Sequence, residues 1–273
     1  MDLFQTLILS FVEGVTEFLP ISSTGHLVLT SQILNIPQTE FVKSFEIIIQ
    51  LGAILAVVLL YFRTLLNTKI WPKIFVAFLP SAFVGLLFYK IIKDILIGNS
   101  LIIVIALFLG GIAFILVEYW HKNLPAGPLR RSISEASRQV NKTEIASIEQ
   151  ITLKNAFIIG LFQSISVVPG VSRAGATILG ALLLKTNRKT AAEFSFILAV
   201  PTMFAATGLD IFQTKLNFSG NELLMLAIGF MASFFFAAIS VKLLIKYLSN
   251  HSFVVFGVYR ITIAIIFYII FLK

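Results

Sequence analysis

Six stretches of this chain are each about as long and as apolar as a helix that crosses the hydrocarbon core of a membrane, which takes roughly 20 residues. Hydrophobic residues fill 58% of the 273 positions and charged residues only 12%, whereas about a quarter of a soluble domain is charged. Such a chain cannot cover a soluble core with polar surface. The sequence therefore predicts an all-α integral membrane protein with about six transmembrane helices, at residues 45–62, 74–92, 101–119, 194–211, 223–245 and 253–271.

Two further apolar stretches, residues 3–34 and 153–185, are each interrupted near the middle by a polar run that contains proline and glycine. The runs read PISSTG and PGVSRAG. Each stretch is too long for one crossing, and each half is too short. Because irregular backbone at membrane depth is tolerated only where it lines a cavity or is buried in protein, we interpret both stretches as re-entrant helical hairpins.

The order of elements is hairpin, three spans, polar loop, hairpin, three spans, which predicts an internal repeat within one membrane domain, residues 1–273. We place the first repeat at 1–120, a polar cytoplasmic loop at 121–152 and the second repeat at 153–273. An offset of 149 superposes Pro20 on Pro169 and Ser23 on Ser172. Because each half has an odd number of crossings, the second repeat must be inverted. Paired broken helices in inverted repeats indicate a site near the bilayer midplane.

Lys and Arg are concentrated in the loops on one side of the predicted spans, with fourteen on the side opposite the N-terminus and five on the N-terminal side. Positively charged loops stay in the cytoplasm, so we expect both chain termini to lie outside. The first hairpin would then enter the membrane from outside and the second from the cytoplasm, and their tips would meet.

The residue inventory limits the chemistry that is open to this chain. It has no cysteine, which excludes disulfides, thiolate nucleophiles and cysteine-based metal sites. Its three histidines form no HExxH pair, so a zinc hydrolase is not expected and any metal would be a hard cation on oxygen ligands. The net charge of +8 suits a protein beside anionic lipid headgroups. Membrane lipids are therefore expected partners, and nucleic acid is not.

Residues 13–26, EGVTEFLPISSTGH, place Glu13 and Glu17 one helical turn apart on the same face. Two neighbouring carboxylates at low dielectric are not easily both ionised, so they would share a proton, bind a cation or face a basic side chain. The alternative is that both are solvated at the membrane–water interface. Ionisable residues inside a membrane are functional candidates, and the apolar flanks favour function.

Pro20 ends the first half-helix, and Ser22, Ser23 and Thr24 follow it. One of these hydroxyls suffices to cap the second half-helix, whose N-terminus is itself an anion site suited to phosphate. A spare serine is then available as a nucleophile. His26, three residues after Ser23, would on its own be a structural hydrogen-bond partner. Beside serine and glutamate it becomes a candidate general acid or base.

The second polar run extends to PGVSRAGAT, residues 169–177. Gly170 permits a tight turn and close approach of a ligand, and Ser172 and Thr177 supply hydroxyls. Arg173 brings a permanent positive charge to membrane depth. It either pairs with one of the two glutamates or binds a phosphate with two hydrogen bonds. The two interpretations are compatible, because Arg173 could hold the carboxylates until the substrate arrives. Together these groups indicate phosphoryl chemistry.

EGVTEFLPISSTGH and PGVSRAGAT resemble the two signature segments of the bacterial undecaprenyl-diphosphate phosphatases, the bacitracin-resistance family, and GLFQSISVVPG and AAEFSFILAVP extend the likeness over essentially the whole chain. The resemblance implies hydrolysis of a polyprenyl diphosphate lipid to its monophosphate and inorganic phosphate. That reaction recycles the lipid carrier for cell-wall synthesis and confers bacitracin resistance. The resemblance also implies a bacterial plasma-membrane enzyme, a site open to the outer face, and a divalent cation, Mg²⁺ or Ca²⁺.

By motif position, the resemblance assigns Glu13 and Glu17 as the paired acidic residues and candidate metal ligands, Ser23 as the nucleophile and His26 as its acid–base partner. Arg173 belongs to the phosphate-binding segment and completes the candidate catalytic set. Ala174 stands where the family often has serine, so that hydroxyl is dispensable or supplied elsewhere. A phosphoserine route and direct attack by water both stay open. The candidate substrate-binding residues on the two polar runs are Ser22, Thr24, Gly170, Ser172 and Thr177.

A transporter or flippase of polyprenyl phosphates is the competing hypothesis, because inverted repeats with broken helices are transporter architecture. Serine, histidine and two glutamates at one loop exceed what binding alone needs and favour the enzyme. A purely structural membrane subunit would leave the buried charges unexplained, and a homodimer stays open. Arg260, inside the last apolar stretch, needs a partner there. We expect a structural role for it, with Glu46, Glu193 and Asp210 as candidate partners.

Overall fold

The computed structural model describes residues 1–88, 99–122, 144–213 and 218–272. As the sequence predicts, these ranges are helical, and the β-structure within them is limited to an isolated bridge between Ile145 and Thr186. Most of the predicted polar loop at 121–152 and the end of the predicted span at 74–92 lie outside the described residues.

Six helices are long and apolar enough to cross a membrane, which confirms the predicted number. Most begin a few residues earlier than predicted because a polar residue caps the helix ahead of the apolar run. Thr39 and Ser219 do so by accepting hydrogen bonds from backbone N–H groups three residues later. The six helices are α3 (Glu40–Leu60), α5 (Trp71–Leu87), α7 (Ser100–Lys122), α11 (Arg188–Gln213), α12 (Gly220–Leu248) and α13 (Val254–Phe271).

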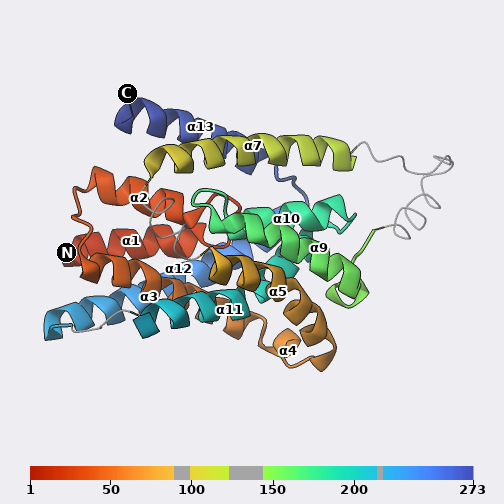
Figure 1. Ribbon diagram of the computed structural model, residues 1–273, viewed down its shortest axis with the longest axis horizontal. Coiled ribbons are helices and arrows are strands. Elements are labelled where there is room, and N and C mark those ends of the chain that lie inside the picture. Colours follow the sequence, from red (N-terminus) through yellow and green to blue (C-terminus); the bar gives the residue numbers. More distant parts are fainter. Residues whose placement is uncertain (89–98, 123–143, 214–217, 273) are drawn as a thin grey trace.

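Both interrupted stretches fold into two helices joined by a loop, as predicted. The first is α1 (Leu3–Thr16) and α2 (Ser23–Ile33), and the second is α9 (Leu153–Ser164), a 3₁₀ turn η5 (Ile165–Val167) and α10 (Arg173–Leu183). In Figure 1 the first hairpin starts and ends at the end of the molecule that carries both chain termini, and the second starts and ends at the opposite end. Their loops face each other between the two ends. That the hairpins dip into a bilayer stays a prediction.

Equivalent positions in the two hairpins stand 150 residues apart, so the offset of 149 expected from the sequence is wrong there. Ser22 caps α2 and Ser172 caps α10, with φ angles of 73° and 75° and side chains that accept from a backbone N–H three residues later. The predicted offset aligned the two loop prolines, which are one position out of register. The counterpart of Ser23 is therefore Arg173, and the serine equivalent to Ser172 is Ser22.

The hairpins are held in place by close packing on the spans. α1 packs on α12 and α9 on α5, while α7 pairs with α13 (Figure 1). Glycine permits the close approach, because a Cβ atom at Gly14 would collide with the carbonyl oxygen of Ser233, and one at Gly160 with that of Ala77. This packing fixes the positions of the two loops. Three short turns, α4 (Phe62–Leu65), η1 (Thr68–Ile70) and η4 (Ile148–Gln150), lie at the end away from the termini (Figure 1).

Candidate active site

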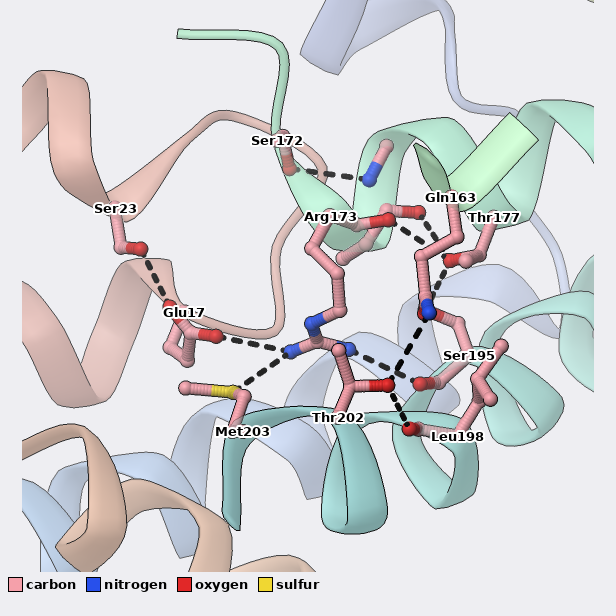
Figure 2. A network of polar contacts seen from close by, with 12 residues as sticks. Glu17, Ser23, Gln163, Ser172, Arg173, Thr177, Ser195, Leu198, Thr202 and Met203 are labelled. Atoms are coloured by element: carbon pink, nitrogen blue, oxygen red, sulfur yellow. Dashed lines mark hydrogen bonds and ion pairs between the residues drawn. The ribbon is translucent and has the colours of Figure 1, made fainter. Parts of the chain in front are cut away.

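Arg173, the first residue of α10, reaches across to the loop of the first hairpin (Figure 2). Its Nη2 donates a hydrogen bond to Glu17 Oε1 at 2.9 Å, and its Nη1 donates to the backbone carbonyl of Ser195 at 3.0 Å. The guanidinium carbon lies 5.6 Å from the centre of the Phe18 ring. Within the described ranges its Nε–H has no hydrogen-bond partner. The side chain is thus held in one orientation, with one buried donor that has no partner among the described residues.

Glu17 joins that arginine to a serine of its own hairpin. The Ser23 hydroxyl donates to Glu17 Oε2 at 2.5 Å (Figure 2). Ser22, not Ser23, caps α2 by accepting from the backbone N–H of Gly25. The Ser23 hydroxyl is therefore not needed by the helix and is directed at a carboxylate that can take its proton. Ser23, Glu17 and Arg173, three predicted catalytic residues, form one continuous chain.

His26 lies in the first turn of α2 but faces away from this chain. Its Nδ1 is 2.8 Å from the Ser22 carbonyl oxygen, and its Nε2 is 2.7 Å from the Tyr259 hydroxyl. Because a carbonyl only accepts, Nδ1 of the neutral ring carries the proton and the Tyr259 hydroxyl donates to Nε2. The ring that was predicted to deprotonate Ser23 is thus engaged elsewhere, and Glu17 is the group in contact with that hydroxyl.

Glu13 lies one turn before Glu17, as predicted, and is fully buried. In the part of the chain that the structure describes, neither of its carboxylate oxygens has a hydrogen-bond partner. Burying an ionised carboxylate alone is costly, so this group must hold a proton or meet a cation. The described residues contain no cluster of three or more His, Asp or Glu suited to a metal. Glu13 and Glu17 can therefore supply only part of the ligand set that a cation needs.

One cavity of about 550 Å³ collects most of the predicted site. The N-termini of α2 and α10 both border it, and a helix N-terminus presents unpaired N–H groups and a positive dipole end. The cavity is thus suited to an anion. The predicted site residues that line it are Glu17, Ser22, Ser23, Thr24, Gly170, Ser172 and Arg173.

Thr177 is fully buried and does not line the cavity, although it was a candidate for substrate binding. Its hydroxyl lies 2.6 Å from the Ser195 hydroxyl and 3.0 Å from the backbone carbonyl of Arg173. Because Ser195 also accepts from the guanidinium, Thr177 supports Arg173 from behind. Glu13 and His26 likewise lie outside the cavity lining.

The cavity wall contains a polar network that the motifs did not single out. Gln163 of α9 is fully buried, and its Nε2 donates to the hydroxyls of Ser81 at 2.6 Å and Thr202 at 3.2 Å. Ser81 belongs to α5 and Thr202 to α11, and both line the cavity (Figure 2 shows Thr202). A glutamine inside the apolar stretch of α9 was the available signal in the sequence, but its partners could not be read from spacing.

Arg260 ties the two hairpin loops to α7 and is fully buried. Each of its five N–H groups donates to a backbone carbonyl, at distances from 2.9 to 3.3 Å. An arginine has five such donors, so its hydrogen-bonding capacity is filled. The accepting residues are Pro20 in the first loop, Gly170 and Val171 in the second, and Ala106 and Leu107 in α7.

We predicted that Arg260 pairs with a carboxylate, and for two of the three candidate residues this prediction is wrong. Glu46 accepts from Ser31 and Gln38, and Glu193 lies 4.0 Å from Lys189. The side chain of Asp210 lies outside the described residues. The prediction failed because three backbone carbonyls of the two hairpin loops and two of α7 together accept all five guanidinium N–H groups, and the sequence does not reveal these acceptors.

Known proteins match nearly the whole of this chain. Residues 6–266 match the family model described as bacitracin resistance protein BacA. A protein of Sulfurihydrogenibium sp. named undecaprenyl-diphosphatase is 48% identical over 269 residues, which cover 98% of this chain and 99% of that protein. Proteins of the same name from Aquifex aeolicus and Wolinella succinogenes are 48% and 46% identical, over 100% and 98% of this chain and 100% and 97% of theirs.

Proposed function

This chain belongs to the bacitracin resistance protein family, and on that premise we propose that it is an undecaprenyl-diphosphatase whose active site lies between the loops of its two hairpins. The observation that carries the proposal is the chain from Ser23 through Glu17 to Arg173. It brings a hydroxyl, a carboxylate and a guanidinium together in one cavity, which supports their roles as nucleophile, proton acceptor and phosphate-binding cation. Phosphoryl transfer depends mainly on such positioning and charge stabilisation.

The terminal phosphate would bind against Arg173 and the N-termini of α2 and α10. Arg173 now donates to Glu17, and a guanidinium can exchange a carboxylate for a phosphate because both accept paired hydrogen bonds. When its bond to Glu17 moves to the substrate, Glu17 loses its counter-charge and becomes a better proton acceptor. Substrate binding would thus prepare the base.

In the covalent route, the Ser23 hydroxyl gives its proton to Glu17 while its oxygen attacks the terminal phosphorus. The bond from that phosphorus to the bridging oxygen breaks, and undecaprenyl phosphate leaves. Water then hydrolyses the phosphoserine to inorganic phosphate. The other route has water attack directly, with Glu17 accepting its proton and Ser23 only binding the phosphate. The hydrogen bond from the Ser23 hydroxyl to the Glu17 carboxylate supports the covalent route.

A divalent cation, Mg²⁺ or Ca²⁺, would be held by Glu13 and Glu17 together with oxygens of the diphosphate, since Mg²⁺ is usually bound by one or two carboxylates plus substrate phosphates. When bound it would supply positive charge to the phosphate oxygens. The unpartnered oxygens of the buried Glu13 support this assignment.

The reaction would take place in a bacterial plasma membrane, with the site open to the outer face and both termini outside. Six spans of sufficient length support the membrane location, and the excess of Lys and Arg in the opposite loops supports the orientation. There the enzyme would recycle the lipid carrier of cell-wall synthesis and so confer resistance to bacitracin.

Phosphate release from detergent-solubilised protein tests the proposal and separates it from the flippase hypothesis, because micelles have no sides for lipid to cross. We expect purified protein to convert undecaprenyl diphosphate to equal amounts of undecaprenyl phosphate and inorganic phosphate. Absence of phosphate release, together with movement of the lipid across liposomes that contain the protein, would instead establish a transporter.

A further inference from the structure

The polar side chains that line the cavity come from two parts of the fold. Most belong to the loops and helix ends of the two hairpins, among them Ser23 and Arg173. Three others lie within the spans α3, α5 and α11, and these are Gln50, Ser81 and Thr202. The proposed function uses the hairpin residues and leaves the span residues without a task.

Two of the span residues have no donor free for a ligand. The Ser81 hydroxyl donates to the backbone carbonyl of Phe78 and accepts from Gln163 Nε2. The Thr202 hydroxyl donates to the carbonyl of Leu198 and accepts from the same nitrogen (Figure 2). A hydroxyl has a single donor, and in both residues a carbonyl of the same helix takes it. These two side chains therefore form a satisfied wall.

Gln50 differs from them because its side chain has no partner. It lies in the middle of α3, is partly buried and lines the cavity. In the part of the chain that the structure describes, its amide makes no hydrogen bond. An amide inside a membrane span costs free energy unless it is hydrogen-bonded, and its NH₂ group has two donors. Gln50 thus offers two donors at the cavity to a ligand with acceptor oxygens.

The geometry of phosphoryl transfer indicates which part of the substrate Gln50 would meet. The attacking and leaving oxygens lie roughly in line, on opposite sides of the phosphorus. The attacking oxygen, of Ser23 or of a water beside Glu17, lies at the loop of the first hairpin. The leaving phosphate must then point away from that loop, toward the walls that the spans form.

We propose that Gln50 binds the substrate by donating hydrogen bonds to the phosphate that carries the prenyl chain, which is the phosphate that leaves. This inference rests on the proposed phosphatase function. The amide stabilises the negative charge that develops on the bridging oxygen as the bond to the terminal phosphorus breaks.

A neutral amide also suits the release of the lipid product. A hydrogen bond from a charged donor to a phosphate is roughly twice as strong as one between neutral groups. The terminal phosphate is bound by the guanidinium of Arg173, whereas the prenyl monophosphate is held by Gln50 without a positive side chain. A prenyl monophosphate fills one of these two positions only, so the pair selects for a diphosphate.

Two substitutions test the role of the amide. Gln50→Met keeps the length of the side chain and has no donor, and Gln50→Glu keeps its shape but replaces the donors by negative charge. Gln32→Met is the matched control, because Gln32 is exposed on α2 and lies outside the cavity lining. For each full-length variant in detergent micelles, corrected for the folded fraction, we would measure kcat/KM for farnesyl diphosphate. The inhibition constants of farnesyl phosphate and of inorganic phosphate are measured beside it.

We expect Gln50→Met to lower kcat/KM about tenfold or more, the factor typical of a hydrogen bond to a charged group. The inhibition constant of farnesyl phosphate should rise by a similar factor, while that of inorganic phosphate, which binds at Arg173, stays near the wild-type value. Gln50→Glu should lose more activity than Gln50→Met, because its carboxylate repels the phosphate. Gln32→Met should behave as the wild type.

Wild-type kcat/KM in both Gln50 variants, or unchanged inhibition by farnesyl phosphate, would overturn the inference. Equal weakening of both inhibitors would place Gln50 at the terminal phosphate and overturn the assigned position. In each case the phosphatase function would stand, because the wild-type protein still releases phosphate. No phosphate release by the wild-type protein would overturn the proposed function, and the role of Gln50 with it.

Discussion

Ser22 and Ser23 are adjacent at the residue scale, yet the fold gives them different tasks. Ser22 caps α2, whereas the Ser23 hydroxyl is bound to Glu17. We expect Ser22→Ala to cost about 0.5–2 kcal/mol of stability, as for a lost cap, with turnover retained in the folded protein. Ser23→Ala should retain stability and lose nearly all turnover. Phosphate-release rates, with thermal unfolding as the control, distinguish the two. Substantial activity in Ser23→Ala would eliminate the covalent route.

His26 and Tyr259 form a second testable pair at this scale. If His26 acts by holding the Ser22 backbone, its partner should matter as much as the ring itself. We expect Tyr259→Phe and His26→Gln each to reduce turnover, with a double variant no worse than the more damaged single one, because both remove one interaction. The measurement is kcat/KM for the three variants. Full activity in Tyr259→Phe beside an inactive His26→Gln would show that His26 acts chemically instead.

The residue types of the site were predictable from sequence, because charged and hydroxyl side chains inside apolar stretches are costly unless they have partners or a function. Their pairings were less predictable. Spacing placed His26 near Ser23, but the first turn of α2 directs the ring toward Tyr259, a partner 233 positions away. Gln163 and Ser195 were missed because single polar residues in a membrane helix carry no periodic signal.

At the scale of elements, the two hairpins are positioned by Arg260 of α13. Arg260→Met would leave the loop carbonyls of Pro20, Gly170 and Val171 without the donor they have now, and each unsatisfied buried group costs about 1–3 kcal/mol. We expect a strong fall in folded yield and unfolding temperature, partly recovered in Arg260→Lys, which keeps three donors. Arg63→Met is the matched control, because Arg63 is exposed in α4. An abundant, stable but inactive Arg260→Met protein would place Arg260 in the site itself.

The hairpins also show how far element prediction reaches. Their existence followed from length, since each interrupted stretch is too long for one span and too short for two. Their register did not, because the loop prolines suggested an offset of 149 whereas the caps Ser22 and Ser172 stand 150 apart. A proline in each loop does not fix the backbone geometry there, so it does not show which residues of the two loops are equivalent.

At the scale of the whole molecule, the excess of positive loops predicts that the end carrying the termini faces outside. The chain has no cysteine, so single cysteines report sidedness cleanly. We expect an impermeant maleimide to label Gln38→Cys, in the linker between α2 and α3, on intact cells. It should label Asn250→Cys, between α12 and α13, only after permeabilisation. The opposite pattern would invert the orientation and place the site toward the cytoplasm.

The central claim is that the two halves of the molecule build one phosphatase site where Glu17 of the first meets Arg173 of the second. A second ion pair, between the buried Glu118 and the partly exposed Arg188, joins α7 and α11 at 2.7 Å outside the cavity lining and serves as the control. The direct measurement is the rate of phosphate release from undecaprenyl diphosphate by Arg173→Lys, Glu17→Gln and Arg188→Lys, each corrected for the folded fraction. We predict that Arg173→Lys and Glu17→Gln lose nearly all turnover, because a lysine cannot replace the paired donors of a guanidinium, whereas Arg188→Lys loses stability only. Turnover near that of the wild type in folded Arg173→Lys and Glu17→Gln would contradict the account.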